Sequence, residues 1–154
     1  MPENAASREA KDRVISKLDG YGMGFVQKGR SKDWLVSRSR SVSVFLTYSN
    51  YHLQQRGYWY DVAVKNVMEM DEYKKALIIF LLGSSDRLVV IPMGEMFRLI
   101  KENGGTKMAS DGTVKIHIDR RDGEFVLREA GNASLLKSLN RFDLISGEIS
   151  AGRS

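Results

Sequence analysis

The chain has 154 residues, 42% of them hydrophobic, which suits a single domain with one core. It contains no cysteine and only two histidines, so disulfides and thiolate metal sites are excluded and a zinc site would have to rest mostly on carboxylates. The formal net charge of +5 comes from residues 1–57, where ten lysines and arginines stand against five acids, because residues 58–154 hold fourteen of each.

The first elements in chain order are a helix, a short strand and an arginine-rich hairpin. Residues 4–18 carry apolar side chains at helical spacing and predict a helix, which the glycines that follow are expected to end. Residues 23–27 predict a short strand. In the segment "VSRSRSVSVF", one continuous strand would place Arg38 and Arg40 on the same face as valines and would bury them. We therefore predict strands at 33–37 and 42–48, with both arginines at the turn between them.

The strand "YWYDVAVK" at residues 58–65 alternates, so Tyr58 and Tyr60 share one face and Trp59 and Asp61 the other. We assign the aromatic side chains of this strand to packing within the sheet and core rather than to binding. The remaining elements are expected to be a helical turn or long loop at 66–75, a strand buried on both faces at 76–82, a strand at 88–92, a helix at 93–103, a hairpin over 111–128 and an amphipathic helix at 133–145.

This order predicts an α+β fold with a mixed, largely antiparallel central sheet flanked by helices. We expect one domain over residues 1–146 and a flexible C-terminal tail over 147–154. The longest apolar run has seven residues, against about 20 needed to cross a bilayer, and the polar N-terminus does not resemble a signal peptide. A cytoplasmic protein without a membrane partner is therefore the expectation.

Several segments between residues 6 and 119 carry a family resemblance. They are a starting helix, a short strand, a basic loop, an aspartate opening a hairpin ("SKDW"), the strand "YWYDVAV", and a strand that ends in isoleucine-proline and runs into a helix ("LVVIPMGEMFRLI"). Their order resembles the core of the PD-(D/E)xK restriction-endonuclease-like superfamily, in particular small intron-associated and defence-associated members. The resemblance implies a restriction-endonuclease-like core.

In that superfamily, an aspartate on the second core strand and an acid-x-lysine set on the third hold Mg²⁺ and polarise a water. Asp33 matches the first aspartate, but the next strand, "SVSVFLTYS", offers neither the acid nor the lysine. Asp61 and Lys65 share a face of the following strand, with Ala63 where a second acid would stand. Asp33, Asp61 and Lys65 are therefore the candidate catalytic residues, with Asp33 and Asp61 as Mg²⁺ ligands only if the chain is an active nuclease.

Two groups of residues suggest nucleic-acid binding. Five cations come from two loops that the predicted hairpin is expected to bring to one end of the sheet, where they could neutralise several phosphates. A loop before the aromatic strand adds side chains that can stack on bases or hold the backbone. The candidate nucleic-acid-binding residues are Lys28, Arg30, Lys32, Arg38, Arg40, Tyr51, His52 and Arg56, with Arg120 and Arg121 of the later hairpin turn as secondary phosphate contacts.

The function expected from these patterns is nucleic-acid binding, to DNA rather than RNA, through the N-terminal basic face, without hydrolysis and without a cofactor. One alternative is an active Mg²⁺-dependent nuclease of the same fold. Another is a protein-interaction or assembly subunit, including a homo-oligomer, whose basic face is incidental and whose seven methionines leave room for an apolar partner surface.

Overall fold

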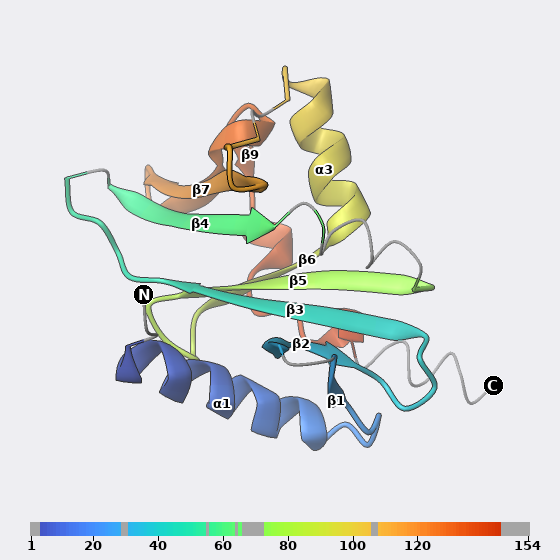
Figure 1. Ribbon diagram of the computed structural model, residues 1–154. Helices are drawn as coiled ribbons and strands as arrows, with labels where there is room; N and C mark the ends of the chain where they lie inside the picture. The colour runs from blue at the N-terminus through green and yellow to red at the C-terminus, as the bar shows by residue number, and fades with distance from the viewer. Residues whose placement is uncertain are drawn as a thin grey trace.

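The computed structural model describes residues 4–28, 31–54, 56–63, 65, 73–105 and 108–145. Two sheets pack face to face, with one helix beneath the larger sheet and another beside the smaller one (Figure 1). The larger sheet, sheet A, has five strands in the order β1-β2-β3-β5-β6, and the smaller, sheet B, has four in the order β4-β7-β8-β9. This arrangement confirms the α+β class and the mixed, largely antiparallel sheet.

Sheet A begins as an antiparallel meander and then becomes mixed. Its strands are β1 (Val26–Lys28), β2 (Ser31–Val36), β3 (Val42–Ser49), β5 (Lys75–Leu82) and β6 (Leu88–Pro92). Strand β5 runs parallel to β3 and antiparallel to β6. It is apolar at nearly every position because both of its faces are buried.

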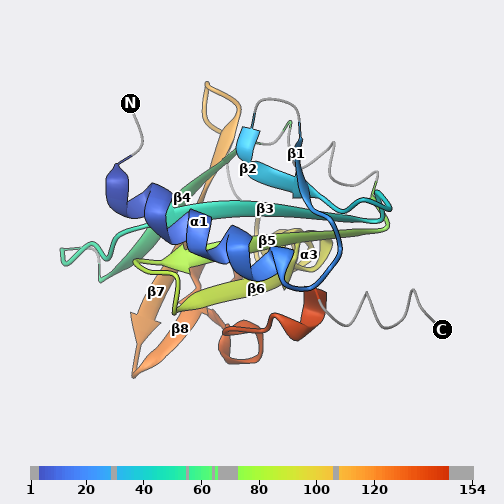
Figure 2. The same cartoon turned by 90° about the horizontal axis from the view of Figure 1, so that it is seen from below.

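Helix α1 (Ala5–Asp19) lies across one face of sheet A (Figure 2). Its first turn is capped by the Asn4 side chain, whose Oδ1 accepts a hydrogen bond of 2.7 Å from the Ser7 backbone N–H. Val14 and Leu18 face the sheet and are almost completely buried. A core between α1 and sheet A follows from this contact.

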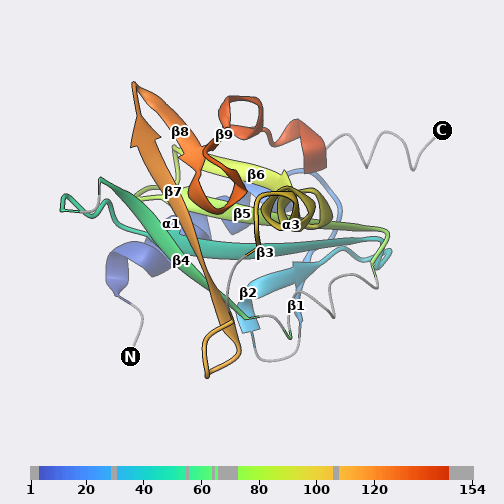
Figure 3. The ribbon, with the colours of Figure 1, turned by 90° about the horizontal axis from the view of Figure 1, so that it is seen from above.

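Sheet B covers the other face of sheet A and lies in front of it in Figure 3. Its strands are β4 (Gly57–Ala63), β7 (Thr113–Arg121), β8 (Glu124–Leu127) and β9 (Ala133–Ser134), all paired antiparallel. Helix α3 (Met93–Glu102) packs beside it and buries Met93, Met96 and Ile100 in the core that both sheets share.

The arginine-rich segment forms the predicted hairpin. Strands β2 and β3 pair antiparallel, and the turn between them carries Arg38 and Arg40, both exposed. Arg40 adopts a left-handed backbone conformation with φ of 61°. The connection between the first two strands is shorter than the strands predicted at 23–27 and 33–37 imply, because β1 extends to Lys28 and β2 begins at Ser31.

The predicted helix at 133–145 is wrong. The segment instead contributes β9 and a short 3₁₀ turn, Leu136–Ser138, and Asn140 then pairs with the edge of β6: its backbone N–H donates to Leu88 O and its side chain accepts from Leu88 N. Asn140 has a positive φ of 52°, which interrupts an α-helix, and among the described residues of the segment only 143–145 are α-helical. The leucines recur at helical spacing, but protection of the β6 edge decides the conformation.

Most of the helical turn or loop predicted at 66–75 lies outside the described residues. All of the flexible tail predicted at 147–154 also lies outside them. Within the described ranges, no helix combines the length and the apolar character needed to pass through a bilayer.

Candidate functional site

The two faces of sheet B differ in chemistry because side chains alternate along its strands. Tyr58, Tyr60 and Ile116 point inward and are buried. Trp59 lies directly across from His117, and Asp61 from Lys115, on the opposite, outer face. Polar and charged groups are thereby gathered on one surface of the molecule.

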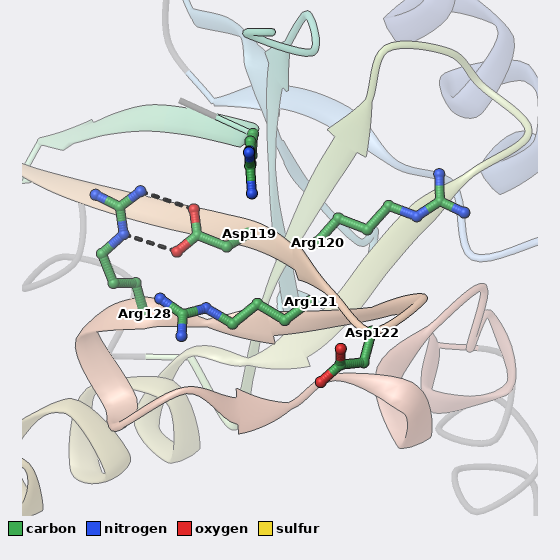
Figure 4. Close-up of a pocket in the computed structure, with 6 residues that line it drawn as sticks. Asp119, Arg120, Arg121, Asp122 and Arg128 are labelled. Carbon is green, nitrogen blue, oxygen red and sulfur yellow. Dashed lines mark hydrogen bonds and ion pairs between the residues drawn. The ribbon is translucent and has the colours of Figure 1, made fainter. Parts of the chain in front are cut away.

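A cleft of about 560 Å³ lies at the end of this outer face, beside the β7–β8 turn (Figure 4). Arg56 reaches it from the turn before β4, Arg121 from the end of β7, and Arg128 from the 3₁₀ turn η1 (Arg128–Ala130). We call it the arginine cleft; its walls are Arg56, Asp119, Arg120, Arg121, Asp122 and Arg128.

Asp119 holds the centre of the arginine cleft in place. Its carboxylate is buried and accepts two hydrogen bonds of 2.7 Å, from Nε and from a terminal guanidinium nitrogen of Arg128. This bidentate geometry fixes the guanidinium plane. The hydrogen bonds to Asp119 raise the pKa of Arg128 above its usual value, against the opposing effect of partial burial.

Gly57 has no side chain, which allows the backbone of β4 to lie close to Asp119. It lies opposite Asp119 in the β4–β7 register, and a Cβ placed on it would stand 2.7 Å from both Asp119 Oδ1 and the backbone O of Ile118. Just before it, Arg56 takes a left-handed conformation with φ of 53°, and its carbonyl accepts a 3.2 Å hydrogen bond from Arg120 N. The turn is thus tied to the β7 strand end.

The arginine cleft carries a surplus of positive charge. Four arginines and two aspartates line it, and one of the two carboxylates is already bound to Arg128. Within the described part of the chain, the side chains of Arg56 and Arg121 make no hydrogen bond or ion pair. Figure 4 shows Arg121 directed toward the Arg128–Asp119 pair and Arg120 directed away from it. Free guanidinium groups around a hollow are suited to phosphate or another oxyanion.

The N-terminal cations whose side chains the structure describes, Lys28, Arg38 and Arg40, do not form the expected single platform. Lys28 stands at the β1–β2 turn and pairs with Ser31, whereas Arg38 and Arg40 lie at the β2–β3 turn. Consecutive turns of an antiparallel meander fall at opposite ends of the strand they share, and the six residues of β2 separate these two by about 20 Å. Arg30 and the side chain of Lys32 lie outside the described residues.

The side chains of these N-terminal cations also have local contacts. Lys28 Nζ lies 6.0 Å from the centroid of the Trp34 ring. The Arg38 side chain lies against Gly24, where a Cβ would stand 2.8 Å from Arg38 Nε. The expected convergence of the two loops is wrong, whereas exposure of Arg38 and Arg40 at the hairpin turn is confirmed.

Asp33 and Asp61, the candidate metal ligands, lie in different sheets. Asp33 on β2 accepts salt bridges from Arg8 (2.9 Å) and Lys11 (2.8 Å) of helix α1, while Asp61 on β4 pairs with Lys115 at 3.3 Å. Lys65 follows β4 and is exposed. Across the described ranges, no group of three or more His, Asp or Glu side chains is arranged to hold a metal ion. Both aspartates thus serve salt bridges between elements.

Burial lowers the pKa of Arg8, but its hydrogen bonds to Asp12 and Asp33 outweigh this and raise the pKa above its ordinary value. The strand expected to supply the acid and the lysine, β3, places Ser43 in the core, where its Oγ accepts a 2.6 Å hydrogen bond from Trp34 Nε1. This position is fully buried and serves packing.

The turn between β3 and β4 brings together the other three predicted nucleic-acid-binding residues. It closes through hydrogen bonds between His52 and Gly57, of 2.8 Å and 3.4 Å. His52 packs edge-on against Trp59 with ring centroids 5.4 Å apart, and Tyr51 packs edge-on against Tyr58 at 5.5 Å. Arg56 enters the arginine cleft. His52 and Arg56 therefore sit at the edge of the polar face of sheet B, whereas Tyr51 packs against the inward-pointing Tyr58.

Two side chains that line the arginine cleft, Asp119 and Arg128, had no role in the expectations from sequence. Arg120 and Arg121 were expected only as secondary contacts. One signal was available: in the predicted 111–128 hairpin, alternation puts Asp119 and Arg121 on the same face. Arg56 is more than sixty positions away from both residues in the sequence. The pairing of β4 with β7 brings it close to them.

Comparison of the sequence with protein-family models and with curated proteins finds no match. The function must therefore be inferred from the site.

Proposed function

We propose that this chain is a nucleic-acid-binding domain that holds phosphates in the arginine cleft. The observation that carries the proposal is the convergence of Arg56, Arg121 and Arg128 on one hollow with a buried carboxylate as anchor. Phosphate groups favour guanidinium partners because the planar fork offers two parallel N–H donors. Arg128 keeps one edge bound to Asp119, which holds its guanidinium in place, while Arg56 and Arg121 supply unpaired donors.

A polymer with regularly spaced phosphates fits this surface better than a single small anion. The arginine cleft is open to solvent on an exposed hairpin, and one aromatic side chain on the outer face of β4, Trp59, follows two residues after Gly57. Aromatic rings next to cations are the combination with which proteins hold bases and backbone together. DNA is the expected polymer, in line with the expectation from the sequence. RNA is the alternative that a binding experiment has to include.

We keep a restriction-endonuclease-like architecture without hydrolysis as part of this proposal. Its support is the element order α1-β1-β2-β3 with Asp33 on β2. The role of Asp33 in salt bridges with Arg8 and Lys11, and the buried serine at the position expected for a ligand on β3, favour binding over cleavage.

The test is a titration of labelled single-stranded and duplex oligonucleotides, of DNA and of RNA, at increasing NaCl. Two to three phosphate contacts predict that log K falls against log salt with a slope of about −2 to −3. Arg121→Gln should lower the slope by about 1, because it removes one contact. No binding at low salt, or binding that does not respond to salt, would overturn the proposal.

A further inference from the structure

A second hollow of about 330 Å³ lies between the start of α1, the end of β3 and strand β4. Every side chain that lines it is polar or aromatic, including Trp59, His52, Asn50 and Asp61. We call it the Trp59 pocket. Its volume is at the small end of the range for ligand sites.

Some polar atoms of the Trp59 pocket are already used to build its wall. The Tyr48 hydroxyl donates to Asn50 Oδ1 at 2.8 Å, and Ser49 Oγ accepts the Trp59 backbone N–H at 3.2 Å. These contacts tie the end of β3 to β4 and hold the wall rigid. The pocket is therefore formed before any ligand arrives, which lowers the entropic cost of binding.

Other polar atoms of the pocket have no partner within the described residues. They are the Asn50 amide nitrogen, the second carboxylate oxygen of Asp61 and the ring nitrogens of His52. One wall thus offers a hydrogen-bond donor, an acceptor and an imidazole. A base edge presents complementary donors and acceptors.

Trp59 supplies the flat surface that a base needs. Lys115 Nζ lies 4.4 Å above its ring and His52 meets it edge-on, so the indole is held in one orientation. Lys115 lies outside the wall of the pocket, which leaves a different part of the indole to line it. Stacking on an aromatic side chain is available to every base and requires that the base be unpaired.

One turn joins the two hollows. His52 lines the Trp59 pocket, Arg56 lines the arginine cleft, and Gly57 lies against Asp119 only two residues before Trp59. Two strand residues span about 7 Å, so a chain with its base at Trp59 has its phosphates close to the arginines. A duplex keeps its bases stacked and paired, and cannot offer one to a pocket without the free-energy cost of unpairing it.

We infer that the Trp59 pocket takes an unpaired base of single-stranded DNA or RNA whose backbone lies on the arginine cleft; this rests on the proposed function. The chain's two tryptophans make it directly measurable, because Trp34 is buried at 4% exposure while Trp59 lines the pocket. Quenching of tryptophan emission by a bound base therefore reports on Trp59.

The experiment titrates the protein with oligo(dT), oligo(rU), duplex DNA and inorganic polyphosphate, following binding and tryptophan emission together. Both single strands should bind and quench; polyphosphate, which has no base, should bind without quenching, and duplex should bind more weakly than single strand. Trp59→Phe should abolish the quenching and Trp34→Phe should retain it. His52→Ala should weaken oligonucleotide binding about 5-fold or more and leave polyphosphate unchanged, with the exposed Gln54→Ala on the same turn as matched control.

Binding of oligonucleotides without quenching, or equal quenching by polyphosphate, would overturn the base pocket while leaving the arginine cleft standing. Absence of binding by every polyanion would overturn both. A difference between oligo(dT) and oligo(rU) of about 10-fold or more would assign the ligand to one nucleic acid.

Discussion

The inner and outer faces of sheet B are built from alternating residues of the same strands and do different things. On β7, Ile116 and Ile118 are fully buried against sheet A, while their neighbours His117 and Asp119 belong to the polar surface. A change on the inner face should therefore act on stability, and a change on the outer face on binding. The outer-face groups that anchor the arginine cleft are expected to affect both.

The largest effect is expected from the inner face. Ile116→Ala removes a fully buried side chain between the sheets and should lower the free energy of unfolding by about 3 kcal/mol. Urea denaturation measures this. The neighbouring Lys115→Ala, at an exposed position, is the matched control and should change stability by less than about 1 kcal/mol. Equal losses for the two variants would contradict the division between the faces.

The anchor of the arginine cleft comes next. Arg128→Gln strips the buried Asp119 carboxylate of both its donors and should cost about 2 kcal/mol of stability. Arg141→Gln is a matched control, because Arg141 also makes two hydrogen bonds of 2.7 Å to one carboxylate. The side chains of Arg141 and Arg128 are 43% and 42% exposed, but Asp143, the partner of Arg141, is 61% exposed. That variant should lose less than about 1 kcal/mol.

If Arg141→Gln lowers the free energy of unfolding as much as Arg128→Gln does, the burial of Asp119 is not what makes the cleft rigid. A further check is Asp119→Asn combined with Arg128→Gln. Removing both charges should recover part of the stability lost in the single Arg128 variant, because no buried charge is then left unpaired.

A smaller effect is expected from Tyr60, on the inner face beneath Trp59. Its hydroxyl donates a 2.9 Å hydrogen bond to Leu81 O, and burial, together with the nearby Tyr58 and Tyr48, raises its pKa well above the usual value. Tyr60→Phe should cost about 1 kcal/mol at neutral pH.

The same pKa predicts a pH dependence. The folded state keeps the Tyr60 proton while the unfolded state releases it above about pH 10, so stability is present below that pH and falls as pH rises. Unfolding between about pH 8 and about pH 11 should show a steeper loss for the wild-type chain than for Tyr60→Phe. Equal slopes for the wild-type chain and Tyr60→Phe would contradict this assignment.

Much of the fold could be predicted from the sequence because the decisive signals are local. The alternation in "YWYDVAVK" placed Tyr58 and Tyr60 inward, and the conflict of Arg38 and Arg40 with neighbouring valines placed a turn between β2 and β3. Trp59 was expected on the face opposite the tyrosines, and it is, although its position in a pocket was not foreseen.

The site could be predicted only in part because it depends on which strands pair. Lys28 and Arg38 are close in sequence yet stand at opposite ends of β2, whereas Arg56 and Arg121 are far apart in sequence yet share a cleft through the β4–β7 pairing. Charge clustering in sequence therefore did not show which cations lie together in the fold. The prediction of a helix at 133–145 was wrong for a similar reason, because the conformation there depends on the pairing of Asn140 with the edge of β6.

The most direct measurement compares two variants with the same net charge: Arg56→Gln/Arg121→Gln, in the arginine cleft, and Arg38→Gln/Arg40→Gln, at the β2–β3 turn. Affinity for a labelled single strand, measured at one fixed low salt concentration, should fall about 10-fold or more for the first pair and less than about 3-fold for the second. Equal losses would mean that the total charge of the chain governs binding. A larger loss for the β2–β3 pair would contradict the assignment of the phosphate site to the arginine cleft.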